Sequence, residues 1–318
     1  MEVNEIQNKI NTLQNEIATV IKGKDEVIRK VIMAILASGH VLLEDVPGLG
    51  KTTLAKAFSK ALGFANKRIQ FTPDTMPSDI VGMSIYNEQT NAFEYVEGAA
   101  VHCNLLLGDE INRTSSKTQS ALLEAMAEGR VTVDGVTHLL LEPFVVIATQ
   151  NPVTSGGTQA LPDSQLDRFM ICLSMGYPDS ESQLAILKNV SDRDLIEMVQ
   201  PVMTIADVME AKHFVKNMKV NDEILRYIIT LCEQTREHPA VDLGISPRGV
   251  GAVAEMAKAY ALCHGREYVV PEDVLAIFPD VCAHRLILNT KARRENVSAC
   301  DILEQIVRQV EKPKLLRK

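Results

Sequence analysis

The sequence predicts an α/β domain with a parallel β-sheet, followed by a helical domain. Strand-like runs alternate with helical patterns through residues 1–177, and this alternation is typical of a parallel sheet covered by helices on both faces. From residue 178 to the C-terminus only helical periodicity is found, with no convincing strand. Two domains are also expected because 318 residues exceed the size, about 250–300 residues, at which single hydrophobic cores stop growing.

Helices are predicted where apolar residues recur at three- and four-residue spacing. In the N-terminal helix this apolar face is formed by Ile6, Ile10, Leu13 and Ile17. Further helices are predicted over residues 27–36, 52–62 and 116–128, each with a glycine near its end that stops the helix. In the second domain, the prolines after Ser246 and Val270 fall where the first turn of a helix tolerates them.

Four segments are predicted to be strands of the sheet: residues 41–43, 67–72, 105–107 and 144–148. Most of them contain continuous apolar runs, as expected for parallel strands that are buried on both faces. Residues 131–133 and 136–138 alternate in polarity on both sides of Asp134-Gly135, which predicts a β-hairpin.

The composition excludes several classes of protein. A net charge of −8 argues against binding nucleic acid or anionic lipid through bulk charge, and 4% aromatic residues argue against an extended base-stacking surface. The longest apolar runs are far shorter than the ~20 residues that span a bilayer, and the N-terminus lacks the pattern of a signal peptide. We therefore expect a cytoplasmic protein with no membrane span. The six cysteines show no metal-ligand spacing and are expected to be mostly buried free thiols.

A phosphate-binding loop is predicted between the first strand and the helix that follows it. The strand at residues 41–43 leads into a loop that contains Gly48 and Gly50, and Lys51-Thr52 then opens a helix. The two glycines let backbone N–H groups approach phosphate oxygens, and the positive end of the helix dipole points at the anion. Lys51 supplies a charge to the β- and γ-phosphates, and the hydroxyl of Thr52 can ligate Mg²⁺. The sequence therefore predicts a site for a nucleoside triphosphate and Mg²⁺.

This loop departs from the strict pattern at one position, where the chain has Asp45 instead of glycine. Asp adopts left-handed backbone conformations more readily than most residues, so we expect the turn to form. The carboxylate of Asp45 must then point away from the phosphates. The alternative is an ordinary Gly/Pro turn between a strand and a helix, which does not explain why the whole strand–loop–helix context is present.

Acidic and amide side chains follow two other predicted strands. Asp109 and Glu110 come just after residues 105–107; Asp109 would hold Mg²⁺ directly or through water, and Glu110 would orient and polarise the attacking water. Asn151 follows the last predicted strand and suits a residue that senses the γ-phosphate and positions water. Taken alone, the acidic pair is usually a strand end and Asn151-Pro152 a turn signal. A phosphate loop earlier in the same chain favours the functional interpretation.

Taken together, these motifs resemble the MoxR family of AAA+ ATPases. Five segments carry the resemblance, in the order Walker A, Walker B with its following helix, sensor 1, arginine finger and sensor 2: residues 39–52, 109–126, 148–152, 161–169 and 246–248. Asp is a familiar variant at position 45 in this family. The resemblance extends from Ile21 to about Asp280. It brings in two arginines, Arg168 and Arg248, which would each be interpreted as a solvated surface charge if taken singly.

The resemblance implies a role for each of these residues. The residues that would bind ATP and Mg²⁺ are Asp45, Pro47, Gly48, Leu49, Gly50, Lys51, Thr52 and Thr53, with Thr52 and Asp109 as metal ligands. Glu110 would be the catalytic base, Asn151 would be sensor 1, and Arg248 would be sensor 2, closing the lid on the nucleotide. Arg168 would act in trans, on the γ-phosphate of the neighbouring subunit. The adenine would be contacted by Ile21 and Gly23.

The resemblance also implies an assembly, a client and a partner. The family typically forms hexameric rings and is thought to act as chaperone-like ATPases that mature other complexes, often with a von Willebrand factor A-domain protein. Residues 1–177 would be the ATPase core and residues 178–318 the helical lid. Insertions at about residues 78–98 and 130–141 would face the pore or one rim of the ring. We therefore expect a homo-oligomer with a protein client and no nucleic acid.

Three alternatives stay open. One is a nucleotide-gated binding module with slow turnover. A second is a P-loop kinase or a nucleic-acid motor; a simple kinase needs neither Arg168 nor a lid that carries Arg248, and a DNA motor would be expected to show a basic surface, which the net charge does not favour. The third is the ATPase subunit of a metal-chelatase-like complex, which shares the hairpin insertions and is the nearest enzymatic alternative.

Overall fold

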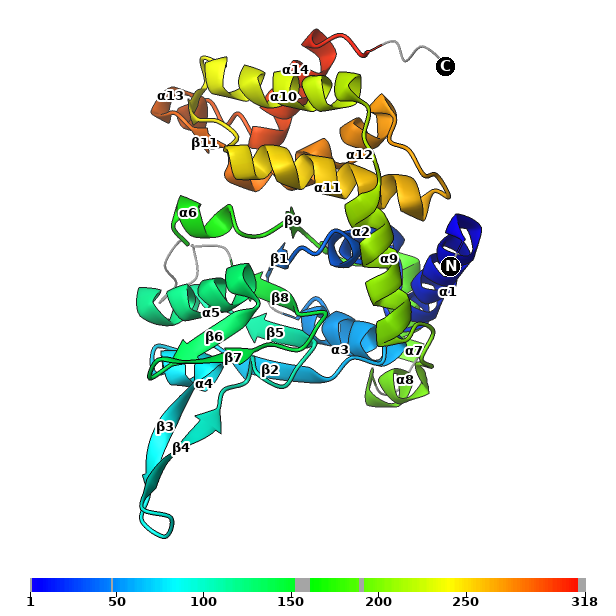
Figure 1. Cartoon of the computed structure of the whole chain (residues 1–318). Coiled ribbons are helices and arrows are strands. Elements are labelled where there is room, and N and C mark those ends of the chain that lie inside the picture. Colours follow the sequence, from blue (N-terminus) through cyan, green and yellow to red (C-terminus); the bar gives the residue numbers. More distant parts are fainter. Residues whose placement is uncertain (1, 47, 152–160, 189–191, 314–318) are drawn as a thin grey trace.

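The core of the molecule is a five-stranded parallel sheet with the strand order β2-β5-β8-β1-β9 (Figure 1). Its strands are β1 (Val41–Glu44), β2 (Asn66–Gln70), β5 (Leu105–Asp109), β8 (Val145–Gln150) and β9 (Ile171–Leu173). This computed structural model describes residues 2–46, 48–151, 161–188 and 192–313. The predicted α/β core is confirmed, since all four predicted strands belong to the sheet, and β9 completes it beside β1.

Each central strand supplies two separate hydrophobic cores because successive side chains of a strand point to opposite faces of the sheet. In β1, Val41 and Leu43 belong to one core, whereas Leu42 belongs to the other. The first core is covered by α1 (Val3–Val20), α2 (Asp25–Leu36) and α3 (Lys51–Ala61), and the second by α4 (Pro77–Val81) and α5 (Ser116–Glu128). Burial on both faces accounts for the continuous apolar runs in these strands.

The chain after β9 is mostly helical. Its helices are α7 (Ser180–Lys188), α8 (Asp192–Met198), α9 (Ile205–Asn217), α10 (Asp222–Glu237), α11 (Pro247–Cys263), α12 (Pro271–Cys282), α13 (Thr290–Arg294) and α14 (Ala299–Gln309). Residues of α11 and α12 share the first core with α1 and α2, and Lys30 Nζ of α2 lies 2.8 Å from Asp280 Oδ2 of α12. The helical lid therefore packs against α1 and α2, on the face of the sheet that the first core covers. The division at residue 177 falls between β9 and α7 and stays a prediction.

The prediction that no strand follows residue 178 was wrong. The lid contains a short antiparallel pair, β10 (Val241–Leu243) and β11 (Ile287–Leu288). These strands are too short to produce a periodic pattern, and they pair only because the fold brings distant segments together.

Two β-hairpins extend from the core. The predicted hairpin is confirmed as β6 (Arg130–Val133) and β7 (Val136–Leu139), whereas β3 (Gly82–Asn87) and β4 (Ala92–Glu97), inside the segment 78–98, were not predicted as strands. The β3–β4 hairpin projects from the end of the molecule opposite the lid (Figure 1). The rings of Tyr95 and His138 stack with their centroids 3.8 Å apart and hold the two hairpins together.

The structure also bears on two expectations from the composition, the absence of a membrane span and the state of the cysteines. None of the helices in the described ranges has the length and apolar character needed to cross a membrane. The cysteines are free thiols, and four of them are buried, whereas Cys172 is partly exposed and Cys300 is exposed.

Candidate active site

The phosphate loop joins β1 to α3 and presents its backbone to open space. Gly48 and Gly50 have φ angles of +88° and +83°, a region that favours glycine, and a Cβ at either position would meet no atom within 4 Å. Gly50 is the N-cap of α3, whose first N–H groups have no partner within the helix. Backbone N–H groups without neighbouring side chains, next to the N-terminus of a helix, are the features that bind phosphate. The predicted contact at Pro47 lies outside the described residues.

Lys51 lies along this loop, with its ammonium group inside the cleft. The side chain is largely buried, and Nζ donates to the backbone carbonyl of Asp45 at 2.8 Å. Burial lowers the pKa of Lys51, whereas the charges of Asp45, Asp109 and Glu110 act in the opposite direction. A phosphate oxygen would offer Lys51 a charged acceptor, which forms a stronger hydrogen bond than a neutral carbonyl.

Asp109 ends β5 and lies beside Thr52 in the first turn of α3. Its Oδ2 accepts hydrogen bonds from Thr52 Oγ1 at 3.3 Å and from Arg68 Nε at 2.7 Å, and its Oδ1 accepts one from Thr149 Oγ1 at 3.2 Å. A carboxylate next to a hydroxyl supplies the hard oxygen ligands that Mg²⁺ takes beside a phosphate. The predicted pair of metal ligands, Thr52 and Asp109, therefore fits this metal in chemistry and position.

Arg68 and Gln70 are site residues that the sequence did not indicate. Both lie on β2, and the parallel register places Gln70 opposite Asp109. Arg68 Nη2 donates to Gln70 Oε1 at 3.0 Å, and Gln70 Nε2 donates to Glu110 Oε2 at 3.2 Å. Only the pairing of β2 with β5 brings these residues to the site, so no local signal could have identified them.

Glu110 is held as a charged carboxylate at the same end of the cleft. Its φ of +57° is rare for a residue other than glycine, and its N–H donates to Thr149 Oγ1 at 2.9 Å. The carboxylate accepts from Arg113 Nη1 and from Asn151 Nδ2, each at 2.8 Å. The hydrogen bond from Arg113 is the main cause that lowers the pKa of Glu110, and burial opposes it. A deprotonated carboxylate beside an amide can take a proton from water.

The cleft continues from this phosphate end to an apolar end suited to a base. Gly48, Gly50 and Thr53 line both ends, so the two cavities form one cleft. The apolar end is lined mainly by Ile21, Lys24, Leu49, Met175 and Pro178. Ile21 therefore lines the end that suits a base, and its contact with the adenine stays a prediction.

Gly23 is not among the residues that line the cleft, and its contact with the adenine stays a prediction. Its φ is +67°, and a Cβ at this position would lie 2.4 Å from Ser182 Oγ of α7. Glycine is therefore required here by the close packing of α7 and by the backbone conformation.

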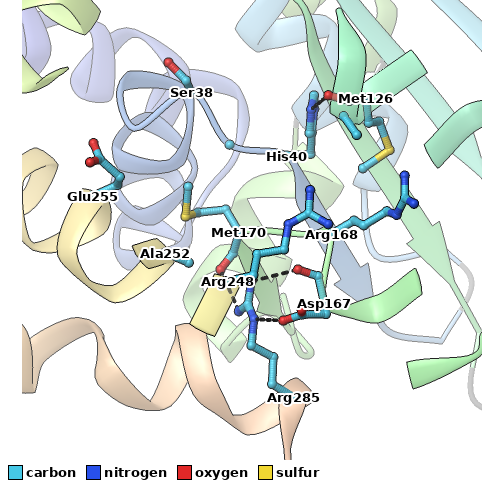
Figure 2. Close-up of a pocket in the computed structure, with 12 residues that line it drawn as sticks. Ser38, His40, Met126, Asp167, Arg168, Met170, Arg248, Ala252, Glu255 and Arg285 are labelled. Atoms are coloured by element: carbon cyan, nitrogen blue, oxygen red, sulfur yellow. Dashed lines mark hydrogen bonds and ion pairs between the residues drawn. The ribbon is translucent and has the colours of Figure 1, made fainter. Parts of the chain in front are cut away.

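Arg168 and Arg248 lie together in a different cavity, which Asp167 and Arg285 also line (Figure 2). Arg168 Nη1 donates to the backbone carbonyl of Leu123 at 2.7 Å, and Arg248 lies exposed in the first turn of α11. Neither arginine lines either end of the nucleotide cleft. The structure therefore does not place Arg248 over the nucleotide cleft of its own chain, contrary to the prediction.

The contacts of Asp167 hold Arg248 in this second cavity. Its carboxylate accepts from Ser246 Oγ at 2.9 Å and from Arg285 Nε at 2.8 Å. Ser246 is the N-cap of α11, so this hydrogen bond holds the first turn of α11 against the segment that carries Arg168. The two arginines are thus fixed on one face of the molecule.

Comparisons with known proteins identify the family. A family model described as the ATPase family associated with various cellular activities (AAA) matches residues 40–171, and one described as an AAA lid domain matches residues 233–306. The chain is 34% identical over 319 residues to Chaperone MoxR1 of Mycobacterium tuberculosis, covering 96% of this chain and 84% of that protein. This chain belongs to the MoxR family of AAA+ ATPases.

Other relatives agree with this assignment. Protein MoxR of Methylorubrum extorquens is 31% identical and covers 86% of each chain. The uncharacterized protein YeaC of Bacillus subtilis is 48% identical and covers 92% of each chain. A crystal structure of a candidate ATPase from Cytophaga hutchinsonii superposes with a TM-score of 0.90 at 37% identity, covering 98% of this chain and 97% of that one.

In this MoxR-family chain the carboxylate of Asp45 points away from the cleft, as predicted, but the reason differs. Asp45 does not have a positive φ, so this position does not need the left-handed conformation that was expected to explain the Asp. Its side chain turns instead to residues 174–176, which follow β9. A side chain is tolerated here because the loop leaves room for it on the side away from the phosphates.

Proposed function

We propose that this chain is the subunit of a homo-oligomeric, hexameric ring that hydrolyses ATP and uses the energy to remodel or mature partner proteins. The observation that carries the proposal is the separation of two sets of residues. The phosphate loop, Asp109 and Glu110 line one cleft, whereas Arg168 and Arg248 line another cavity. A complete hydrolytic site would then consist of the cleft of one chain and the arginine cavity of the next.

Within the cleft, each residue has one part in hydrolysis. The backbone at Gly48 and Gly50 binds phosphate oxygens, and Lys51 donates to the β- and γ-phosphates. Thr52 and Asp109 would hold Mg²⁺, which when bound neutralises charge on those oxygens. Glu110 accepts a proton from the attacking water, and its partner Asn151 orients that water toward the γ-phosphate.

Charge in the second cavity supports a trans role for both Arg168 and Arg248. Of the two carboxylates that line it, Asp167 is paired with Arg285, and Glu255 lies 2.7 Å from Lys258. No carboxylate of the described residues forms an ion pair with Arg168 or Arg248. An arginine in the first turn of a helix is also unfavourable for the helix dipole. The triphosphate of a neighbouring chain would neutralise these charges, as arginine fingers do.

The exposed hairpin supports a protein client. Five large apolar side chains of β3 and β4 are exposed to solvent: Met83, Ile85, Tyr86, Phe93 and Val96. In a ring these hairpins would lie at the pore or at one rim, where a client can reach them. The relatives named Chaperone MoxR1 and Protein MoxR favour a chaperone-like role. A von Willebrand factor A-domain partner and a cytoplasmic location are further parts of the proposal.

The dependence of hydrolysis on assembly tests the proposal. Phosphate release from ATP per subunit is expected to rise steeply with protein concentration and to reach a plateau where rings have formed, because each site needs the arginines of a neighbour. Release should be measured over a concentration series together with the oligomeric state by light scattering. A rate per subunit that is the same for the monomer and the ring would contradict the proposal.

Lys51→Ala is expected to weaken ATP binding by about 2.7 kcal/mol, or roughly 100-fold in Kd, because the largely buried ammonium group is the main charged partner of the phosphates. Titration calorimetry of the full chain measures this change. Lys56→Ala, which removes an exposed lysine from the same helix, is the matched control and should leave the Kd unchanged. Equal affinity of Lys51→Ala and the parent would exclude the phosphate-loop interpretation.

The metal-chelatase alternative has one observation in its favour. The chain is 24% identical, over 73% of its length, to a magnesium-chelatase subunit ChlI homolog of Methanocaldococcus jannaschii. A Glu110→Gln variant that holds ATP should retain its bound proteins in a pull-down. Recovery of a von Willebrand factor A-domain protein would support the MoxR-type function, and recovery of a chelatase-type catalytic subunit would support the alternative. A wild-type ring that binds ATP without releasing phosphate would instead indicate the nucleotide-gated binding module.

A further inference from the structure

The carboxylate of Asp45 is buried and fully engaged with one segment of backbone. It is 7% exposed, and its Oδ1 accepts hydrogen bonds from Ser174 Oγ at 2.7 Å and from the Gly176 N–H at 3.2 Å. Its Oδ2 accepts a hydrogen bond from the Met175 N–H. One side chain of the phosphate loop therefore accepts hydrogen bonds from three consecutive residues that follow β9, about 130 positions later in the chain.

The segment that Asp45 grips forms part of the wall of the base end of the cleft. Met175 and Pro178 line that end together with Ile21. The far end of the segment is held separately, because Lys24 Nζ donates to the Tyr177 carbonyl at 2.9 Å. The position of Met175, however, depends on its N–H, and that N–H is bonded to Asp45.

A glycine at position 45 could not make these contacts. The N–H groups of Met175 and Gly176 both donate to the carboxylate of Asp45, and Met175 is 4% exposed. Without a carboxylate, buried N–H groups would lose their partners, and the segment would have to move to satisfy them. The backbone of the same residue also contacts the phosphate end, since the Asp45 carbonyl accepts from Lys51 Nζ at 2.8 Å.

We propose that Asp45 is a positioning residue for the nucleotide base. Its carboxylate holds residues 174–176 so that Met175 and Pro178 close the base end of the cleft at a fixed distance from the phosphate loop. The departure from glycine thus makes the base end and the phosphate end one rigid unit, and it determines how strongly the base adds to binding. This inference rests on the proposed binding of ATP in this cleft.

Two ligands distinguish the contribution of the base end to binding from that of the phosphate end. Mg-ATP has a base, and magnesium tripolyphosphate has none. In the full chain, Asp45→Gly is expected to raise the Kd of Mg-ATP at least roughly tenfold and to change the Kd of tripolyphosphate by less than about twofold. Titration calorimetry measures both ligands, and thermal unfolding without ligand shows that the variants fold.

Two milder variants test the same point if Asp45→Gly fails to fold. Asp45→Asn keeps the shape, but its amide NH₂ cannot accept a hydrogen bond from an N–H group, so one contact is lost. Ser174→Ala removes one donor and leaves both backbone contacts. Both variants should weaken Mg-ATP selectively, and by less than Asp45→Gly.

Two outcomes would overturn the inference. Unchanged affinity for Mg-ATP in all three variants would show that the contacts of Asp45 do not position the base. An equal loss of affinity for Mg-ATP and tripolyphosphate would show that Asp45 only supports the phosphate loop. If the wild-type chain bound neither ligand, the proposed function itself would fail, a result distinguishable from both because the parent is affected as well.

Discussion

Glu110→Gln is expected to lower ATP hydrolysis by about 10²–10⁴-fold and to leave ATP binding in place. Glutamine has the shape of glutamate but only one acceptor oxygen, so it can keep one of the two hydrogen bonds that Arg113 and Asn151 donate, and it cannot take a proton from water. Steady-state phosphate release measures the loss, and titration calorimetry measures the retained affinity.

The matched control for this variant is Glu304→Gln, which removes the same charge from an exposed position on α14. This control should hydrolyse ATP at the parental rate. If Glu110→Gln turned over ATP as fast as the parent, the assignment of Glu110 as the catalytic base would be wrong.

Arg168→Ala is expected to lower hydrolysis by about 10³–10⁵-fold, the usual contribution of an arginine finger, although the nucleotide cleft of the variant is intact. The reason is that Arg168 lies in the arginine cavity and not in the cleft of its own chain. ATP affinity and ring formation should therefore change little. Arg308→Ala, an exposed arginine on α14, is the control and should retain full activity.

Mixing experiments show whether Arg168 acts in trans. Arg168→Ala chains keep an intact cleft, whereas Lys51→Ala chains keep an intact arginine cavity, so rings that contain both should recover part of the activity that each has lost. Native mass spectrometry confirms that mixed rings form. Full activity of Arg168→Ala at concentrations where rings form, or mixed rings without recovery, would contradict the trans assignment.

Much of the site could be predicted because its chemistry is local in the chain. Gly48, Gly50, Lys51 and Thr52 act through consecutive backbone and side-chain groups, so their spacing alone indicates phosphate binding. Likewise, an apolar strand that ends in Asp109 and Glu110 places both carboxylates at the carboxyl edge of a parallel sheet. At that edge β5 lies next to β8, which ends near Asn151. For these residues, the order in the chain is sufficient to predict that they share one site.

The partners of these residues could not be predicted, because they arise from long-range packing. Arg68 meets Asp109 across 41 positions through the pairing of β2 with β5, and nothing in the residues around Arg68 indicates it. Arg248 was expected over the nucleotide of its own chain. Its actual position follows from the contact of Ser246 with Asp167, across 79 positions.

Strand periodicity and motif spacing express short-range geometry, so the amino-acid sequence alone predicts the α/β core, the phosphate loop and the acidic residues at the strand ends. The contacts of Asp45 with residues 174–176, and the place of Arg168 and Arg248 on one face apart from the cleft, are visible only in the folded chain. The physical reason is that such contacts depend on which surfaces are buried against each other. Asp45 meets residues 174–176 only after β9 has paired with β1, and Arg168 and Arg248 come together only after the lid has packed against the core.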